Sequence, residues 1–135
     1  MSAAKTTYIE GIGRRKTASA RVRLTPASKT EITVNGKKLE EFFGNLSHQK
    51  DILSVLETPD AGIETYSISA KVVGGGVSSQ AESIRLGIAR ALVKEKADRR
   101  SPLKFLGFLK RDPRSVERKK PGLRKARKRP AWSKR

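Results

Sequence analysis

The sequence predicts a two-layer α/β domain over residues 1–109, followed by an extended basic tail over residues 110–135. Three observations support this prediction. Several segments alternate between apolar and polar residues, which is typical of strands with one buried face. A later segment carries apolar residues at spacings of three and four, which is typical of an amphipathic helix. Beyond residue 109, basic residues dominate and few large apolar side chains remain.

Two strands are expected at residues 8–13 and 17–25, on either side of a basic turn. In the second strand, apolar residues alternate with arginines, so one face is apolar and the other is cationic. The basic residues of the turn and of the outer face are Arg14, Arg15, Lys16, Arg21 and Arg23. Their clustering favours contact with RNA, and the alternative is an ordinary solvated sheet face.

A third strand is expected at residues 31–35, where it ends in the tight-turn pair Asn35-Gly36. Residues 37–43 are expected to follow as a short helical segment with apolar side chains to bury. Ser47 then has a side chain suited to cap a second helix over residues 48–57.

A fourth strand is expected at residues 64–73, and the longest helix at residues 79–97. Ser79 and Glu82, three residues apart, have the pattern of a capping box at the start of this helix. The apolar residues of segment 103–109 are expected to pack back against the domain. The result is one sheet of about four strands, with helices on one face and basic side chains on the other.

The triplet Gly74-Gly75-Gly76 precedes the long helix, and free amides at a helix start can cradle a phosphate. One interpretation is a structural turn, and another is a site for a backbone phosphate of RNA. A third is a nucleotide site, because the loop has some resemblance to the glycine and serine loop of the galactokinase, homoserine kinase and mevalonate kinase superfamily. Neither GxxxxGK[ST] nor GxGxxG is present, and those kinases are far longer.

The net charge of +18 divides into +11 in the tail and +7 in the preceding residues, so both parts are expected to face a polyanion. The chain contains no cysteine, which excludes disulfides, thiolate metal ligands and cysteine catalysis. No apolar run approaches the roughly 20 residues that span a bilayer. Because residues 1–7 also lack a hydrophobic signal core, a soluble protein made where it works is expected.

Catalysis is not expected. His48 is the single histidine, and at a helix start it is expected to be a surface or capping residue. The pair Glu40-Glu41, and Glu57 with Asp60, are expected to form internal ion pairs, because acid and base catalysis also needs a positioned partner and a shifted pKa. Neither a metal nor a cofactor is expected.

Residues 118–135 contain ten basic and no acidic side chains, and Leu123 and Trp132 are their only large apolar residues. Such a segment cannot bury enough surface to order itself, so it is expected to be disordered until phosphates neutralise it. Prolines at 121 and 130 exclude one continuous helix, which leaves an extended arm with one helical turn at residues 123–128. Fully extended, residues 110–135 span roughly 85 to 95 Å.

Three stretches carry a family resemblance: YIEGIGRRKTASARVRL at residues 8–24, GGGVSSQAESIRLGIARAL at 74–92 and KKPGLRKARKRPAWSKR at 119–135. Together they closely resemble the family of the ninth protein of the small ribosomal subunit, in its bacterial form. The similarity runs through nearly the whole chain in the family's order. The final SKR fits the bacterial form, because archaeal and eukaryotic relatives end differently.

This resemblance implies an α/β fold with a left-handed βαβ crossover, against the usual right-handed rule. It also implies that the domain binds the 3′ major domain of 16S ribosomal RNA in the head of the subunit, while the tail reaches the peptidyl site. There Ser133, Lys134 and Arg135 would approach the anticodon-loop phosphates of the bound tRNA. The tail residues implied to lie along ribosomal RNA are Lys119, Lys120, Arg124, Lys125, Arg127, Lys128 and Arg129.

Trp132 is suited either to stack on a base or ribose or to wedge into a pocket of the partner. Family members commonly carry Gln followed by Phe or Tyr where this chain has Ala131 and Trp132, so the aromatic residue is kept and the amide is lost. The resemblance further implies contacts with the seventh, tenth and fourteenth proteins of the subunit head. It implies no membrane and no small-molecule substrate, and a cytoplasmic ribosome, with a plastid-encoded copy as the alternative.

Other functions remain open on the sequence alone. A nucleic-acid chaperone or DNA-compacting protein would share the positive charge but would also bind duplex DNA. A small-molecule kinase would bind ATP at the glycine turn and lose it on substitution of Gly75. A basic tail could rest on an anionic membrane, although its lack of apolar residues restricts it to surface attraction.

Overall fold

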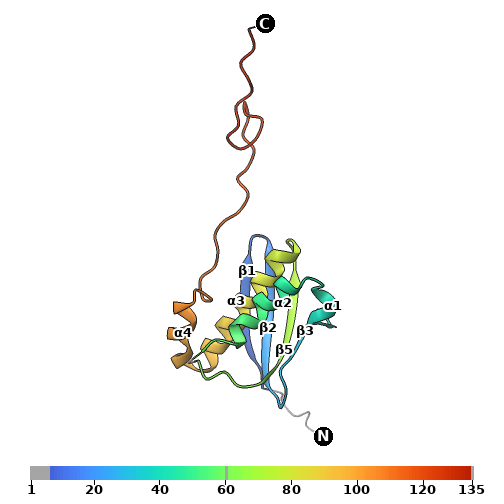
Figure 1. Ribbon diagram of the computed structural model, residues 1–135, viewed down its shortest axis with the longest axis vertical. Helices are drawn as coiled ribbons and strands as arrows, with labels where there is room; N and C mark the ends of the chain where they lie inside the picture. Colours follow the sequence, from blue (N-terminus) through green and yellow to red (C-terminus); the bar gives the residue numbers. More distant parts are fainter. Residues whose placement is uncertain (1–6, 60, 135) are drawn as a thin grey trace.

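The computed structural model describes residues 7–59 and 61–134, which form a five-stranded sheet with helices on one face and a long C-terminal tail (Figure 1). The strands are β1 (Ile9–Arg15), β2 (Ala18–Pro26), β3 (Glu31–Val34), β4 (Lys37–Lys38) and β5 (Tyr66–Val73). The helices are α1 (Leu39–Phe42), α2 (Leu46–Leu56), α3 (Val77–Glu95) and α4 (Arg100–Phe105), with a 3₁₀ turn, η1 (Ala97–Arg99), before α4. We call residues 7–59 and 61–109 the body.

The strands lie in the order β1-β2-β5-β3-β4. All neighbours are antiparallel except β3 and β5, which are parallel and are joined through α1 and α2 as a βαβ unit. The expected α/β architecture is therefore confirmed, with one more strand than predicted.

The additional strand, β4, follows directly from the turn at Asn35 and Gly36. Both residues have positive φ, 51° and 81°, which is the geometry that a two-residue hairpin turn requires. The chain therefore doubles back, and Lys37 and Lys38 pair with Val34 and Thr33. Helix begins only at Leu39, so the expected helical segment at 37–43 is shortened from its start.

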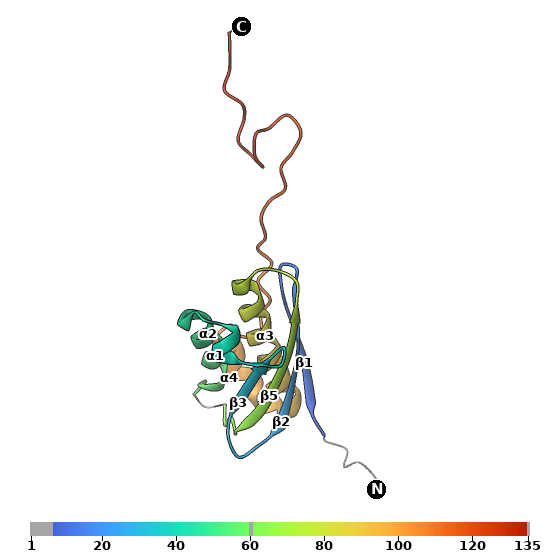
Figure 2. The same cartoon turned by 90° about the vertical axis from the view of Figure 1, so that its right-hand side faces the viewer.

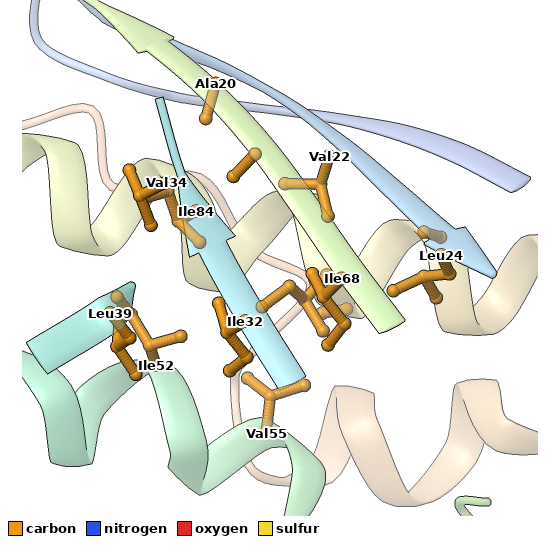
Figure 3. Close-up of a cluster of buried hydrophobic side chains, with 14 of the residues drawn as sticks. Ala20, Val22, Leu24, Ile32, Val34, Leu39, Ile52, Val55, Ile68 and Ile84 are labelled. Carbon is orange, nitrogen blue, oxygen red and sulfur yellow. The ribbon is translucent and has the colours of Figure 1, made fainter. Parts of the chain in front are cut away.

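The core lies between the sheet and the helices. The helices cover one face of the sheet in both views of the molecule (Figures 1 and 2). Side chains from the inner face of the sheet point toward side chains from α1, α2 and α3 (Figure 3). Val22 and Leu24 on β2 are fully buried there, as the alternation predicted. Because every second strand residue faces this core, the residues between them face away from the helices.

Both long helices begin differently from the prediction. Helix α3 begins at Val77 after Gly76, and no side chain caps it. Ser79 is buried within the helix, and the carboxylate of Glu82 accepts a hydrogen bond from the Arg15 side chain. The predicted capping box is therefore wrong, because the helix begins two residues before Ser79, which cannot then be the N-cap, and because Glu82 pairs with a residue distant in sequence. The N-cap of α2 is Asn45, whose side chain accepts from the Ser47 amide, and not Ser47 itself.

The segment at residues 103–109 packs against the body only in part. Leu103 is fully buried, and Phe108 and Leu109 are partly buried against the core, as expected. Phe105 is 91 % exposed and Leu106 is 46 % exposed, so the expected packing of these two residues is wrong. Helix α4 turns Phe105 to the side opposite Leu103.

The tail leaves the body and extends beyond the end of the sheet at which β1 turns into β2 (Figures 1 and 2). The expected helical turn at residues 123–128 is wrong. Gly122 has a positive φ of 80°, and the amide of Arg124 donates to the carbonyl of Lys128 at 2.8 Å. An amide that donates forward along the chain closes a loop and not an α-helix.

Candidate nucleic-acid interface

The face of the sheet that lies away from the helices carries basic side chains on neighbouring strands. Strand pairing places Arg21 on β2 opposite Lys71 on β5. Arg14, on the same side of β1, is exposed near the end of that strand. Because directly opposed residues on neighbouring strands lie close together, Arg21 and Lys71 are adjacent, whereas Arg14 is opposite Ser19 and lies farther along the same side of the sheet. We call this side of the sheet the open face.

One acidic residue lies among these cations. The carboxylate of Glu10 forms ion pairs with Nε of Arg21 at 3.3 Å and with Nε of Arg23 at 3.4 Å, and all three side chains are partly exposed. The Arg23 guanidinium also lies 4.5 Å from the centre of the Tyr8 ring. Exposed ion pairs contribute only about 0 to 1 kcal/mol, so a phosphate can replace Glu10 at either arginine. Two arginines sharing one carboxylate keep a net positive charge.

Arg15 differs from the other basic residues of its turn. Arg14 and Lys16 are exposed, and Lys16 has a positive φ of 53° at the tip of the hairpin. The Arg15 side chain is only 11 % exposed and forms ion pairs with Glu82 on α3 and with Asp112 in the tail. The structure thus places Arg15 between the body and the tail, apart from the open face.

The glycine triplet makes a close contact with β2. Gly74 and Gly75 have positive φ of 75° and 67°. A Cβ atom at Gly74 would lie 2.6 Å from the Thr17 carbonyl oxygen, and one at Gly75 would lie 2.9 Å from Cβ of Ala18. This geometry accounts for the first two glycines by packing alone and favours the structural turn. The side-chain amide of Gln80 donates to the Gly74 carbonyl and holds the turn against α3.

The described basic residues of the tail are all exposed, and so is Trp132. Those named by the family resemblance are Lys119, Lys120, Arg124, Lys125, Arg127, Lys128, Arg129 and Lys134. Ser133 is exposed beside Lys134, while Arg135 lies outside the described residues. Glu117 pairs with Lys120 at 2.5 Å and with Arg127 at 2.9 Å, which closes the loop of the tail on itself.

Sequence reasoning placed residues 110–116 in the basic tail but named none of them as contact residues; we call these residues the tail root. They border a groove of about 470 Å³ together with the tip of the β1–β2 hairpin. The basic residues along this groove are Lys16, Arg111 and Arg114. The one signal in the sequence is Asp112, an acidic residue in an otherwise basic segment.

Asp112 is held by its own neighbour in the chain. The Arg114 side chain donates to its carboxylate at 2.8 to 3.1 Å, and the Arg114 amide donates at 3.0 Å. These hydrogen bonds, and then the nearby charges of Arg114 and Arg15, hold the pKa of Asp112 well below its usual range. Asp112 therefore stays ionised as a partner for Arg15.

The remaining polar candidates of the sequence do not gather into a site. His48 is half-buried beside the Phe43 ring, 6.2 Å away. None of the ion pairs between described residues involves Glu40, Glu41 or Glu57, so the ion pairing expected for these three is not found among those residues. Asp60 lies outside the described residues. Over residues 7–59 and 61–134, no three His, Cys, Asp or Glu side chains are grouped to hold a metal ion.

Among the helices that the structure describes, none has the length and apolar character needed to cross a membrane. What the described residues offer is a broad cationic surface on the open face, a basic groove at the tail root and an exposed basic tail. Such an arrangement attracts a polyanion by charge and by hydrogen bonds to its oxygens.

Comparison with known proteins shows the family to which the chain belongs. The family model described as ribosomal protein S9/S16 matches residues 13–135. The chain is 50 % identical over 127 residues to the small ribosomal subunit protein uS9 of Mycobacterium tuberculosis H37Rv, covering 94 % of this chain and 83 % of that protein. It is 48 % identical to the uS9 of Nocardia farcinica over the same share of this chain and 75 % of that protein. The chain therefore belongs to the ribosomal protein S9/S16 family.

Proposed function

We propose that the protein is a structural component of the small ribosomal subunit that binds ribosomal RNA and performs no catalysis. The observation that carries this proposal is the tail, which extends far beyond the body (Figure 1) and whose described basic side chains are exposed. Cations spread along an extended chain can neutralise successive phosphates of a nucleic-acid backbone, and each neutralised phosphate releases counterions.

The body would bind 16S ribosomal RNA through the open face and the adjacent hairpin. Arg21 and Arg23 are partly exposed and weakly paired, and Arg14 and Lys16 are exposed beside them. Contacts from such side chains go to phosphates and riboses, so they would fix position while the shape of the RNA supplies specificity. Of the glycine triplet, Gly76 has open space around it and would approach RNA through its backbone, while Gly74 and Gly75 would shape the turn by packing against β2.

Residues 110–135 would act as an arm that passes through the subunit head toward the peptidyl site. The basic side chains of residues 119–129 would lie along ribosomal RNA, and Trp132, with its exposed ring, would stack on a base or ribose. Ser133, Lys134 and Arg135 would contact the anticodon-loop phosphates of peptidyl-site tRNA. The seventh, tenth and fourteenth proteins of the head would be neighbours of the body, in a cytoplasmic ribosome.

The test is sedimentation of cell lysate through a sucrose gradient, with the protein followed in each fraction after washes of increasing salt. About ten phosphate contacts lose roughly 10³ to 10⁵ in affinity between 50 and 200 mM salt, so a protein bound only by charge leaves the particles. An assembled component stays with the small subunit after the high-salt wash. Recovery at the top of the gradient would contradict the proposal and would direct attention to binding of duplex DNA.

A further inference from the structure

Arg15 joins three parts of the chain that are distant in sequence. Its Nε lies 2.6 Å from Oε2 of Glu82 on α3, and its Nη2 lies 3.6 Å from Oδ2 of Asp112 in the tail root. Its Nη1 donates a hydrogen bond to the carbonyl oxygen of Arg114. We call these four residues the Arg15 cluster. The guanidinium of one strand residue thus holds both a helix of the body and the backbone of the tail.

Only arginine can make this set of contacts. Its planar guanidinium presents donors in fixed directions, and here all three nitrogens are used on separate partners. A lysine keeps the charge but has a single nitrogen at the end of a flexible stem. Because the Arg15 side chain is 11 % exposed, little of the guanidinium is left for a phosphate.

The Arg15 cluster is the last attachment of the tail to the body. Among the hydrogen bonds and ion pairs of the described residues, those of residues 117–128 join the tail only to itself. Phe108 and Leu109 are the last residues that pack against the core. The described residues beyond Arg114 therefore make no hydrogen bond or ion pair with the body that could direct them.

We propose that Arg15 is a positioning residue, which fixes the tail root to β1 and α3 and so directs the basic tail before it binds. A directed tail has fewer conformations to lose on binding than a freely jointed one, which increases its affinity for RNA. This second step rests on the proposed function, whereas the attachment of the tail root does not. Arg15 then strengthens RNA binding without touching a phosphate, unlike its neighbour Arg14.

The first test measures the direction of the tail in the free, full-length protein. Because the chain has no cysteine, spin labels can be placed on Ser28→Cys and Val116→Cys, both at exposed positions. Electron double resonance then gives the distribution of distances between the far end of the sheet and the tail root. We expect a narrow distribution in the parent and a broad one in Arg15→Lys and in Asp112→Asn. Arg14→Lys, an equal change at the exposed neighbour, should leave it narrow.

Asp112→Asn tests the same attachment without disturbing the fold of the body, because the described contacts of Asp112 are with Arg15 and Arg114 and not with the core. If the distribution stays narrow in both Arg15→Lys and Asp112→Asn, the Arg15 cluster does not direct the tail and the proposal is overturned. If both distributions broaden while Arg14→Lys does not, the positioning role is supported.

The second test measures binding to a transcript of the 3′ domain of 16S ribosomal RNA over a range of salt concentrations. Arg15→Lys keeps the charge, so a loss of about three- to tenfold in affinity at one salt concentration reflects positioning. Arg15→Met should leave unchanged the slope of the logarithm of the binding constant against the logarithm of the salt concentration. Arg14→Met should make this slope shallower by about 0.7 to 0.9 per lost phosphate contact. An equally reduced slope for Arg15→Met would mean direct contact with phosphate and would overturn the proposal.

The two tests separate this inference from the proposed function. If the distances broaden as expected but even the parent protein fails to bind the RNA, the Arg15 cluster directs the tail and the proposed function fails. If the parent binds RNA but Arg15→Lys binds it equally well, the proposed function stands and the role of Arg15 in binding is overturned.

Discussion

Gly11 on β1 and Gly87 on α3 lie so close together that a Cβ atom on Gly11 would stand 2.2 Å from the Gly87 carbonyl oxygen. The same holds two residues along the strand, where a Cβ on Gly13 would stand 1.8 Å from the carbonyl oxygen of Ser83. The helix backbone therefore rests directly on the strand backbone. This contact brings Glu82, one residue before Ser83, within reach of Arg15, two residues after Gly13.

We expect Gly13→Ala to destabilise the protein strongly. The added methyl group would collide with backbone atoms, which cannot move aside as a flexible side chain can, so α3 must shift away from β1. Overpacking of a core usually costs about 1 to 3 kcal/mol, and a backbone collision should reach or exceed about 3 kcal/mol. Urea unfolding followed by circular dichroism measures this cost.

Gly44→Ala is the matched control, since nothing lies within 4 Å of a Cβ there and φ is not positive. Its free energy of unfolding should change by less than about 1 kcal/mol. If Gly13→Ala and Gly44→Ala have equal stability, the close approach of α3 to β1 is not as described.

The sheet could be predicted from the sequence because alternation records which residues face a core. The run from Ala20 to Leu24 and the strand before the glycine triplet were both found in this way, and their inner residues are buried. Strand β4 was missed because two lysines carry no alternation, and the apolar residues just after them have a helical spacing. Its existence depends on the Asn35-Gly36 turn, which folds the chain back on β3.

The candidate interface was less predictable than the sheet. The outward direction of Arg21 and Arg23 follows from strand periodicity, and the structure agrees. The surroundings of Arg15 could not be predicted, because its partners Glu82 and Asp112 lie 67 and 97 positions away along the chain, a separation that no local pattern encodes. The same distant contact explains why the capping-box pattern of Ser79 and Glu82 was misleading.

A second prediction concerns the buried ion pair between Arg99 and Glu95. The Arg99 side chain is 1 % exposed, and its Nη1 lies 2.6 Å from Oε2 of Glu95, which also accepts a hydrogen bond from the Tyr66 hydroxyl. Glu95→Gln would leave the guanidinium buried without a counter-charge, and breaking such a pair costs about 3 to 5 kcal/mol. Thermal or urea unfolding measures this loss. Glu64→Gln, which breaks the exposed pair with Lys96, should cost less than about 1 kcal/mol.

The same pair makes stability depend on pH in a defined direction. Burial would raise the pKa of Glu95, but the hydrogen bonds from Tyr66 and Arg99 outweigh it and lower the pKa in the folded protein. The carboxylate therefore stabilises the fold above the ordinary glutamate pKa of about 4.3, and this contribution is lost as the pH falls below it. Unfolding between pH 7 and pH 3 should show a weaker acid dependence in Glu95→Gln than in the parent. Equal pH profiles would contradict this assignment.

A further prediction concerns RNA binding by the open face. The double variant Arg21→Met and Arg23→Met should bind 16S ribosomal RNA more weakly and with a shallower dependence on salt, by about 1.4 to 1.8 in slope for two lost phosphate contacts. Glu10 pairs with both arginines, so the double variant leaves its carboxylate without either partner. The freed negative charge repels phosphates and cannot compensate for the lost RNA affinity. Filter binding over a salt series measures the slope. Lys50→Met, a change at an exposed lysine on α2, is the control and should leave the slope unchanged. A slope in the double variant equal to that of the parent would contradict binding by the open face.

The last prediction concerns the end of the tail. Removing residues 133–135 should leave assembly of the small subunit nearly normal, because the basic residues at 119–129 remain to hold ribosomal RNA. The truncation removes Lys134 and Arg135, so peptidyl-site tRNA should bind about tenfold more weakly, which corresponds to the loss of about 1.4 kcal/mol. Binding of tRNA to purified subunits that carry the truncated protein measures the effect. The control is the double variant Lys119→Met and Lys120→Met, which removes the same positive charge near the tail root and should weaken binding of ribosomal RNA while leaving tRNA affinity unchanged.

Both variants lose two cations, so a difference in tRNA affinity between them must come from the position of the cations along the tail and not from net charge. Equal tRNA affinity in truncated and parent subunits would refute a contact between the end of the tail and the tRNA.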